Sequence, residues 1–327
     1  MKTAMLIFRT LIAVILGVLT ASVSAQQDYP NKPIRIIVPF PPGGGPSILA
    51  RIFGDKLTQS WGQPVLVDSR GGGNTSIGTQ ALVKSVPDGY TILFMTGAHV
   101  IYPLLIPNLP YDPIRDFTPI ATLAGAELML VVNPEVPANS LAELIALAKA
   151  RPGQLNYASV GSGGLTHLAT EYFAILTGVK LQQIPYKGTA QALPDLAAGQ
   201  VQLFFSPPTD ALPPLIRSGR LKAIAVTGDS RKPALPQVPT FREGGLPDYD
   251  IKAWYGVLGP AGMPRAIVDK LAAEFARHIV APGMKDQLVS MNMDPYYSGP
   301  EQMATLLKVE TAKIAGIIKA ANIRLEN

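Results

Sequence analysis

Short apolar runs alternate with segments of helical periodicity in the first hundred residues after position 26. Residues 34–38 form a β-branched run, and residues 47–61 carry apolar side chains at helical spacing. Two further runs, 64–68 and 90–95, flank a second helical segment at 75–86. Strand–helix–strand units of this length predict right-handed crossovers and a parallel sheet covered by helices on both faces.

The same alternation resumes after residue 127. The expected strands are 128–132, 155–159, 181–184, 201–205 and 221–226, and the expected helices are 141–150, 165–176, 190–198, 264–280 and 301–321. A chain of 327 residues favours two domains over one. We therefore predict an α/β protein with two doubly wound domains.

The second domain is predicted to be inserted into the first. Residues 26–126 and 250–327 are expected to form domain 1, and residues 127–249 domain 2. The segments expected to cross between them are 119–132 and 252–260. Two crossover strands are typical of a hinged clamp. Trp254 and Tyr255 lie in the second crossing, where hinge packing is favoured over a stacking platform for a ligand.

Residues 1–25 have the order of a cleaved secretory signal. Lys2 and Arg9 bound a cationic start, an apolar run covers 11–19, and small residues lead to Ala25. The apolar run is short for a membrane span, so an uncleaved anchor is the less favoured alternative. The mature chain is expected to begin near Gln26 and to be soluble in the periplasm.

The composition excludes several classes of chemistry. The chain has no cysteine, so thiolate zinc sites, cysteine nucleophiles and iron–sulfur clusters are excluded. Without disulfides, a mature chain of about 300 residues must rely on an ordinary hydrophobic core, for which it is long enough. The net charge of +5 includes Lys2 and Arg9, and no Lys/Arg block is present. This argues against nucleic acid as the partner.

Two glycine-rich loops, 39–47 and 159–164, each connect an expected strand to an expected helix. Ligands of open α/β sheets bind at the carboxyl ends of strands. Glycine lets a ligand approach the backbone, and the first helical turn offers unpaired N–H groups and the positive end of the helix dipole. One such loop in each domain indicates an anion-binding cleft. The alternative is that each loop is only a tight turn.

Neither loop fits a motif for nucleotide binding or nucleophilic catalysis. Ile48 and Thr166 stand where a dinucleotide fingerprint needs its last glycine. No Gly-Lys-Ser/Thr triplet is present for a P-loop, and Val160 stands where a nucleophile elbow around Ser162 needs glycine. What remains is an anion cradle without a reactive group, and no cofactor is expected.

The three histidines form no metal-binding motif. His167 and Glu171 are spaced i,i+4, but no second histidine lies nearby, so a polar helix face is favoured over a metal pair. His99 follows the expected strand 90–95, where it either lines the cleft or caps the strand end. No metal site is expected.

Many short motifs in order resemble the Bug family, the TctC-like extracytoplasmic receptors of tripartite tricarboxylate transporters. The resemblance covers essentially the whole mature chain. The matching segments are residues 32–40 with the glycine loop, 70–74 with Ile77 and Gly78, 87–91, 111–113 through Asp116 and Phe117, 167–169 with Glu171 and Phe173, 185–188, and Asp195 and Leu196 with Gly199.

This resemblance implies a type II periplasmic binding-protein fold that closes around a small carboxylate and delivers it to integral-membrane transporter subunits. It implies a monomer that is not an enzyme. The ligand-binding residues carried over are Phe40, Pro41, Pro42, Gly43, Gly44 and Ser47 in the first loop; Ser159, Gly161, Ser162, Gly163 and Thr166 in the second; Gly72, Gly73, Asn74, Thr96, Gly97 and His99 on one wall; and Tyr186, Lys187 and Ser206 on the other.

Two departures from the family pattern bear on the ligand. The family commonly has Thr-Asp after the first glycine loop, where this chain has Pro46-Ser47, and many members carry an aspartate near Ser206. Both changes remove a partner for an ammonium group, so a carboxylate without an amino group is expected. A bulky residue at Gly163 is expected to block the approach of the loop. A signalling receptor with the same closure, and less so a periplasmic enzyme, are the alternatives.

Overall fold

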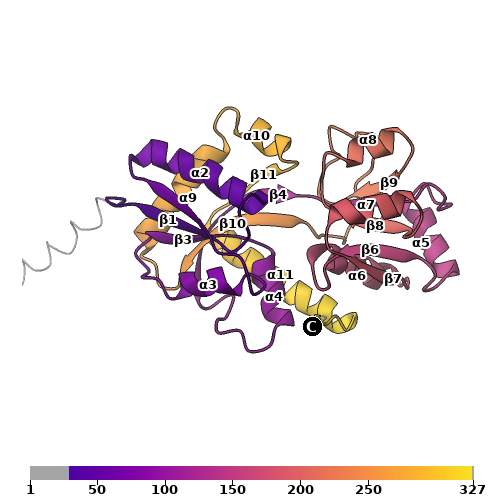
Figure 1. Ribbon diagram of the computed structural model, residues 1–327, viewed down its shortest axis with the longest axis horizontal. Helices are drawn as coiled ribbons and strands as arrows, with labels where there is room; N and C mark the ends of the chain where they lie inside the picture. The colour runs from indigo at the N-terminus through magenta and orange to yellow at the C-terminus, as the bar shows by residue number, and fades with distance from the viewer. Residues whose placement is uncertain (1–28, 326–327) are drawn as a thin grey trace, which may run out of the picture.

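The computed structural model describes residues 29–325, and the predicted signal sequence lies outside that range. Two lobes, each built on its own β-sheet, are joined by a narrow waist of extended chain (Figure 1). Within the described range, no helix combines the length and apolar character that a membrane crossing requires.

The first lobe begins with alternating strands and helices. Its elements are β1 (Ile34–Val38), α2 (Gly45–Trp61), β2 (Val65–Ser69), α3 (Ser76–Val83), β3 (Thr91–Thr96), α4 (Ala98–Leu105) and β4 (Phe117–Ala126). After the second lobe the chain returns with β10 (Ala253–Pro260), α9 (Arg265–Ile279), α10 (Met284–Ser290), β11 (Asp294–Ser298) and α11 (Pro300–Ala320). The strand order of this sheet is β11-β4-β10-β3-β1-β2.

The second lobe is formed by the central part of the chain. Its elements are β5 (Met129–Val132), α5 (Leu141–Ala150), β6 (Asn156–Val160), α6 (Leu165–Thr177), β7 (Gln182–Tyr186), α7 (Thr189–Ala197), β8 (Leu203–Ser206), α8 (Leu212–Arg217) and β9 (Lys222–Val226). The strand order is β7-β6-β8-β5-β9.

Both sheets are mixed, and the expectation of parallel sheets is therefore wrong for part of each. β1 pairs in parallel with β2 and β3, as β6 does with β7 and β8. β10 is antiparallel to β3 and β4, and β5 is antiparallel to β8 and β9. β4, β5 and β10 adjoin the passages between the lobes, and each of them makes antiparallel pairs within its sheet.

Each sheet is covered on both faces. Ile36 packs in a cluster with Phe53 of α2 and Phe275 of α9. Ile37, the next residue, packs in another cluster with Leu82 of α3 and Leu307 of α11. Successive residues of a strand point to opposite faces, so a strand buried on both sides needs the continuous apolar run seen in β1.

The chain passes between the two sheets at two points. Ala126 of β4 pairs with Ala253 of β10 in the first sheet. Leu128 and Ile251, two residues away on each strand, lie instead in the core of the second lobe. The passages therefore centre on Glu127 and Lys252. The domain boundaries at 126/127 and 249/250 stay predictions.

Candidate ligand-binding site

The helices that follow the two glycine loops begin in the same way. Gly44 before α2 has φ −78° and ψ 164°, and Gly164 before α6 has φ −72° and ψ 170°. Neither cap has a side-chain hydrogen bond, and neither first turn contains an acidic residue. Such an end leaves backbone N–H donors and the positive pole of the helix dipole available to an anion. Each lobe supplies one such helix end.

The loop before α6 is held in one shape by its own hydrogen bonds. Gly161 N donates to Tyr186 O at 3.1 Å, and Gly163 N donates to His167 Nδ1 at 3.0 Å. Burial lowers the pKa of His167 to about 4, so the ring is neutral and Nδ1 acts as an acceptor. Gly161 and Gly163 have φ of 74° and 73°, a region that favours glycine.

The metal-pair alternative for His167 and Glu171 has no support in this geometry. His167 is occupied by the loop, and Glu171 accepts a hydrogen bond from the Tyr157 hydroxyl at 2.6 Å. Among residues 29–325, no group of three potential ligands lies close enough to hold a metal ion.

In the first lobe, the turn before α3 is strained. Gly72, Gly73, Asn74 and Thr75 all have positive φ, at 119°, 55°, 51° and 73°. A β-branched residue is rarely found there, and the strain costs on the order of 1–3 kcal/mol. The carbonyl of Thr75 accepts from Thr79 N at 3.1 Å and Thr79 Oγ1 at 2.9 Å, which helps to hold the turn. Strain of this kind is concentrated at binding and active sites.

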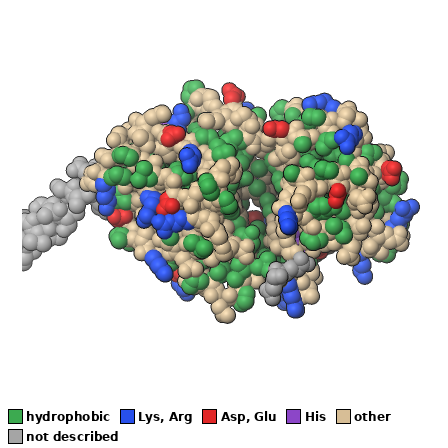
Figure 2. Space-filling model, viewed as in Figure 1, with side chains coloured by type: hydrophobic (Ala, Val, Ile, Leu, Met, Phe, Trp, Pro, Cys, Tyr) green, Lys and Arg blue, Asp and Glu red, His purple; other side chains and the backbone are tan. Residues whose placement is uncertain are grey.

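Between this turn and the loop before α6 lies a wide cavity of about 960 Å³, here called the outer recess. Figure 2 shows the surface hollowed between the two lobes. Of the predicted residues, six line it: Gly73 and Asn74 from the first lobe, and Gly161, Ser162, Tyr186 and Lys187 from the second. Of the residues that the structure describes, the charged ones in its lining are Lys187 and Arg324, both basic and exposed. The recess therefore favours an anionic ligand.

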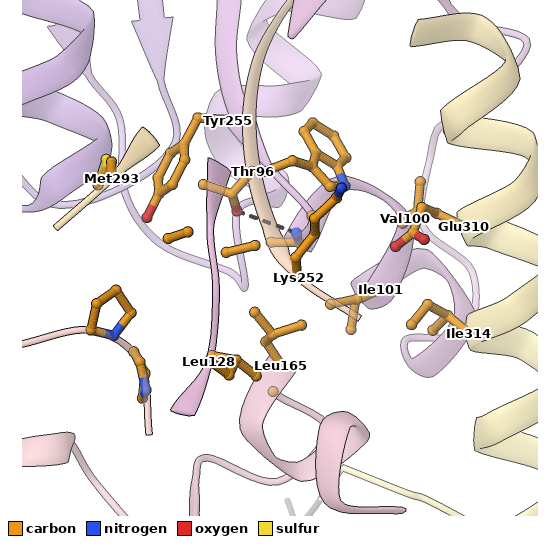
Figure 3. A pocket seen from close by; sticks show the side chains of 18 of the residues that line it. Thr96, Val100, Ile101, Leu128, Leu165, Lys252, Tyr255, Met293, Glu310 and Ile314 are labelled. Atoms are coloured by element: carbon orange, nitrogen blue, oxygen red, sulfur yellow. Dashed lines mark hydrogen bonds between the residues drawn. The ribbon is translucent and has the colours of Figure 1, made fainter. Parts of the chain in front are cut away.

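A second cavity of about 290 Å³, here called the inner pocket, lies beside the waist. Thr96 and Gly97 are the predicted residues that line it. Figure 3 shows side chains from both lobes converging on it: Thr96 and Tyr255 from strands of the first lobe, Leu128 and Leu165 from the second, and Val100, Ile101, Glu310 and Ile314 from α4 and α11.

Sequence reasoning missed Arg324, Lys252 and Glu310 as lining residues. Arg324 and Glu310 lie in or after the last helix, far in sequence from both glycine loops. Only the packing of α11 against α4 and α6 brings this end of the chain to the cleft. No motif in the sequence carried that information.

Four of the predicted hydroxyl side chains form hydrogen bonds within the protein. Ser47 Oγ lies 3.2 Å from Ser69 Oγ, and Thr166 Oγ1 accepts from Val160 N at 2.7 Å. Ser159 Oγ accepts from Gln183 Nε2 at 2.8 Å, and Ser206 Oγ donates to Pro207 O at 2.9 Å. All four residues are buried and line neither cavity. These side chains shape the loops.

The first glycine loop also lies outside both cavities. Pro41, Pro42, Gly43 and Gly44 are exposed, and Phe40 is partly buried against the first-lobe core. The Gly72 and Gly163 backbones are likewise absent from the two linings.

His99 points into the first lobe. It is buried, its Nε2 lies 2.7 Å from Pro113 O, and its ring packs edge-on against Phe117 with centroids 4.5 Å apart. Burial lowers its pKa to about 4, so the ring is neutral and Nε2–H donates to the carbonyl. Helix α4 thus turns His99 away from the cleft, although the neighbouring Gly97 lines the inner pocket.

Sequence reasoning found no nucleophile beside a base, yet the structure places Ser60 against His278. Ser60 Oγ lies 3.0 Å from His278 Nε2, and Glu274 Oε1 lies 2.9 Å from the same nitrogen. A catalytic relay needs the acid on the other ring nitrogen. Ser60 Oγ also donates to Lys56 O at 2.9 Å, so its proton is already engaged. This contact is structural and lies outside the two cavities.

An ion-pair network connects the lobes on another side of the waist. Lys232 of the second lobe pairs with Glu127 at the first passage and with Asp294 of β11. Asn292 Nδ2 of the first lobe donates to Asp210 Oδ1 of the second at 2.9 Å. Burial raises the pKa of Glu127. Burial also lowers the pKa of Lys232, but its two carboxylate partners raise it on balance.

Replacing Lys232 with methionine is expected to lower the free energy of unfolding by about 2 kcal/mol, because two partly buried carboxylates lose their shared partner. Arg231 is the matched control, since its pair with Glu243 is within one lobe and both side chains are 44% exposed. Arg231→Met should cost less than about 1 kcal/mol. Urea denaturation measures both variants. Equal losses would contradict a role for Lys232 in joining the lobes.

The chain is similar in sequence to a known family of receptors. Residues 49–323 match the family described as tripartite tricarboxylate transporter family receptor, TctC. The chain is 36% identical over 308 residues to a protein encoded in the tcbD–tcbE intergenic region of a Pseudomonas species, covering 93% of this chain and 91% of that one. It is 34% identical over 313 residues to protein BugT of Bordetella pertussis, covering 94% of each.

Solved structures show the same fold. A protein of R. palustris with adipate is 33% identical, with a TM-score of 0.72, over 91% of this chain and 100% of that one. MatC of Rhodopseudomonas palustris with bound malate is 29% identical, with a TM-score of 0.68, over 89% and 100%. A TctC solute-binding protein from Polaromonas without ligand is 28% identical, with a TM-score of 0.79, over 89% and 99%. Other similar structures are described as a periplasmic transporter and as the periplasmic binding protein BugD, at 35% and 31% identity.

Proposed function

The chain belongs to the TctC family of tripartite tricarboxylate transporter receptors, and from this premise we propose that it captures a small organic carboxylate in the periplasm and delivers it to the membrane subunits of such a transporter. The ligand is held between the two lobes, which close on it. Two similar proteins of known structure are described with adipate and with malate, which supports a carboxylate as the ligand here.

The uncapped helix starts at Gly44 and Gly164, one in each lobe, carry this proposal. Each lobe contributes an uncapped helix end without an acidic residue in its first turn. Among residues 29–325, the recess between the lobes is lined by Lys187 and Arg324 and by no carboxylate. Closure would bring both positive helix ends to one anion, which neither lobe could hold as well alone. The narrow waist at Glu127 and Lys252 supports a hinge motion.

The site supports a binding protein over an enzyme. The serine–histidine contact at Ser60 lies outside both cavities and lacks relay geometry. A signalling role would use the same closure but a different docking partner. Pull-down of the ligand-bound protein against solubilised transporter subunits and against sensor domains would separate the two.

Saturating carboxylate is expected to stabilise the protein by about 4 kcal/mol at a thousand times Kd, because the ligand binds only the folded state. Thermal melting with adipate, malate, succinate and benzoate tests this. Aspartate is the matched control for succinate, from which it differs by one ammonium group. Since Pro46-Ser47 and Ser206 offer no carboxylate, aspartate should bind at least about tenfold more weakly.

If none of these acids raises the melting temperature, the proposed function fails. If aspartate stabilises the protein more than succinate, the ligand class assigned from Pro46-Ser47 and Ser206 is wrong, while carboxylate binding itself stands.

A further inference from the structure

The inner pocket reaches the start of α6, the helix end at which the proposed function places the ligand carboxylate. Gly164 and Leu165, which begin that helix, line the pocket together with Lys252 and Trp254 at the second passage. A ligand whose carboxylate sits at the start of α6 would therefore extend its body into this pocket. The volume of about 290 Å³ is near the lower end for small-molecule sites.

The walls of the pocket are mainly apolar. Val100, Ile101, Leu128, Leu165 and Ile314 supply aliphatic side chains from both lobes (Figure 3). They suit a short hydrocarbon body, since burying apolar surface yields about 25 cal/mol per Å².

Trp254 contributes an unsatisfied hydrogen-bond donor at the pocket. Its side chain is only 1% exposed, and within the described residues its Nε1 has no hydrogen-bond partner. Nε1 lies beside Gly97, 3.5 Å from the point where a Cβ would stand on that glycine. A buried donor without a partner is destabilising, so an acceptor that reaches it is bound favourably.

Lys252 contributes the positive charge. It is the one basic residue among the pocket-lining residues that the structure describes, and its Nζ lies 4.6 Å from the centre of the Tyr296 ring. The nearby acids are paired elsewhere: Glu310 Oε1 lies 2.7 Å from Lys313 Nζ, and Asp250 also pairs with Lys313. The Lys252 ammonium is thus held by an aromatic face and not by a carboxylate.

We propose that Lys252 and Trp254 are specificity-determining residues that bind a second acceptor group at the far end of the ligand. The preferred ligand is then an acid with an apolar spacer and an acceptor at each end, one at the start of α6 and the other at the waist. This inference rests on the proposed function. In this arrangement the second acceptor binds Lys252, which lies at the passage between the lobes, so the same contact contributes to ligand binding and to closure of the lobes.

Isothermal titration with adipate and hexanoate tests the inference, because the two acids have the same six-carbon length and differ in one carboxylate. The unmodified protein should bind adipate at least about 30-fold more tightly than hexanoate, a difference of about 2 kcal/mol. Lys252→Met should remove that preference by weakening adipate alone. Trp254→Phe, which keeps the ring and loses the donor, should weaken adipate about fivefold.

Lys149→Met is the matched control. Lys149 is exposed on α5 and lines neither cavity, so this substitution removes the same charge at a site away from the ligand. Its preference for adipate should equal that of the unmodified protein. Hexanoate affinity reports whether the Lys252 and Trp254 variants still fold and bind. The inference is overturned if the unmodified protein binds both acids equally, if another acid of the panel binds while adipate does not, or if each variant weakens both acids alike.

Tighter binding of 2-aminoadipate than of adipate would also overturn the inference, because it would indicate that Glu310 binds an ammonium group in the pocket. These results are distinct from failure of the proposed function, in which no acid of the panel binds at all.

Discussion

Gly163→Val is expected to weaken carboxylate binding at least about 100-fold, which corresponds to about 2.8 kcal/mol. Gly163 has φ 73°, where a β-branched residue is strained. A Cβ there would lie 2.5 Å from Leu105 Cδ1 and 3.1 Å from Leu325 Cδ2. Relief of these contacts would move the loop before α6 or displace the Leu105 side chain, which lines the outer recess. Titration with the tightest-binding acid of the panel measures the loss.

Gly153 provides a matched control for backbone strain. It also has φ 73°, but a Cβ there meets no atom within 4 Å, and its N–H bonds to Lys180 O at 2.9 Å away from the cleft. Gly153→Val should cost about 1–3 kcal/mol of stability and leave affinity within about twofold. If Gly163→Val binds as tightly as the unmodified protein, or if both variants lose affinity equally, the loop is not part of the cradle.

Acidification from pH 6.5 to pH 4 is expected to cost about 3 kcal/mol of folding stability for each of His99 and His167. Burial lowers the pKa of each from 6.5 to about 4. Between these values the unfolded chain binds a proton that the folded protein does not, so stability falls by about 1.4 kcal/mol per pH unit per histidine. His278 acts in the same direction, since burial lowers its pKa too.

Urea denaturation at several pH values measures this slope. His99→Asn and His167→Asn should each reduce the slope by about 1.4 kcal/mol per pH unit, whatever they do to stability at neutral pH. Burial raises the pKa of Glu171 and Glu127, so these groups oppose the histidine effect as pH falls through their folded-state pKa. Comparison of each histidine variant with the unmodified protein at the same pH, over the window from pH 6.5 to pH 4, cancels their contribution. If the free energy of unfolding, compared in this way, does not change across that window, the two histidines are protonated in the folded protein as they are in the unfolded chain.

The repeating units were predictable because their signals are local. The run at 34–38 matches β1, and helical spacing gave α2, α5, α6, α9 and α11 to within a few residues. α4 and α7 each contain an internal proline, and α4 was missed. β11 was also missed, because Asp294-Pro295-Tyr296 lacks the apolar run of a central strand and the element pairs only at the sheet edge.

The candidate site was predictable in part. Gly73, Asn74, Gly161, Ser162, Tyr186 and Lys187 were expected at the cleft and line the outer recess, while Thr96 and Gly97 line the inner pocket. The direction of a side chain was not predictable from its position at a strand end. Gly97 and His99 are two residues apart, yet the turn of α4 sends His99 toward Pro113. The hydroxyls of Ser47 and Ser206 are likewise turned to partners inside the protein.

The sequence by itself determined the α/β alternation, the glycine caps of α2 and α6, and the family to which the chain belongs. These depend on periodicity and on residues close together in the chain. Only the tertiary structure decided the mixed strand order, the ion pairs of Lys232, and the meeting of Lys252, Trp254 and Glu310 at one pocket. Those features join residues from distant parts of the chain, such as Lys232 with Asp294 and Lys252 with Glu310, and such pairings are set by the packing of whole elements and leave no local pattern.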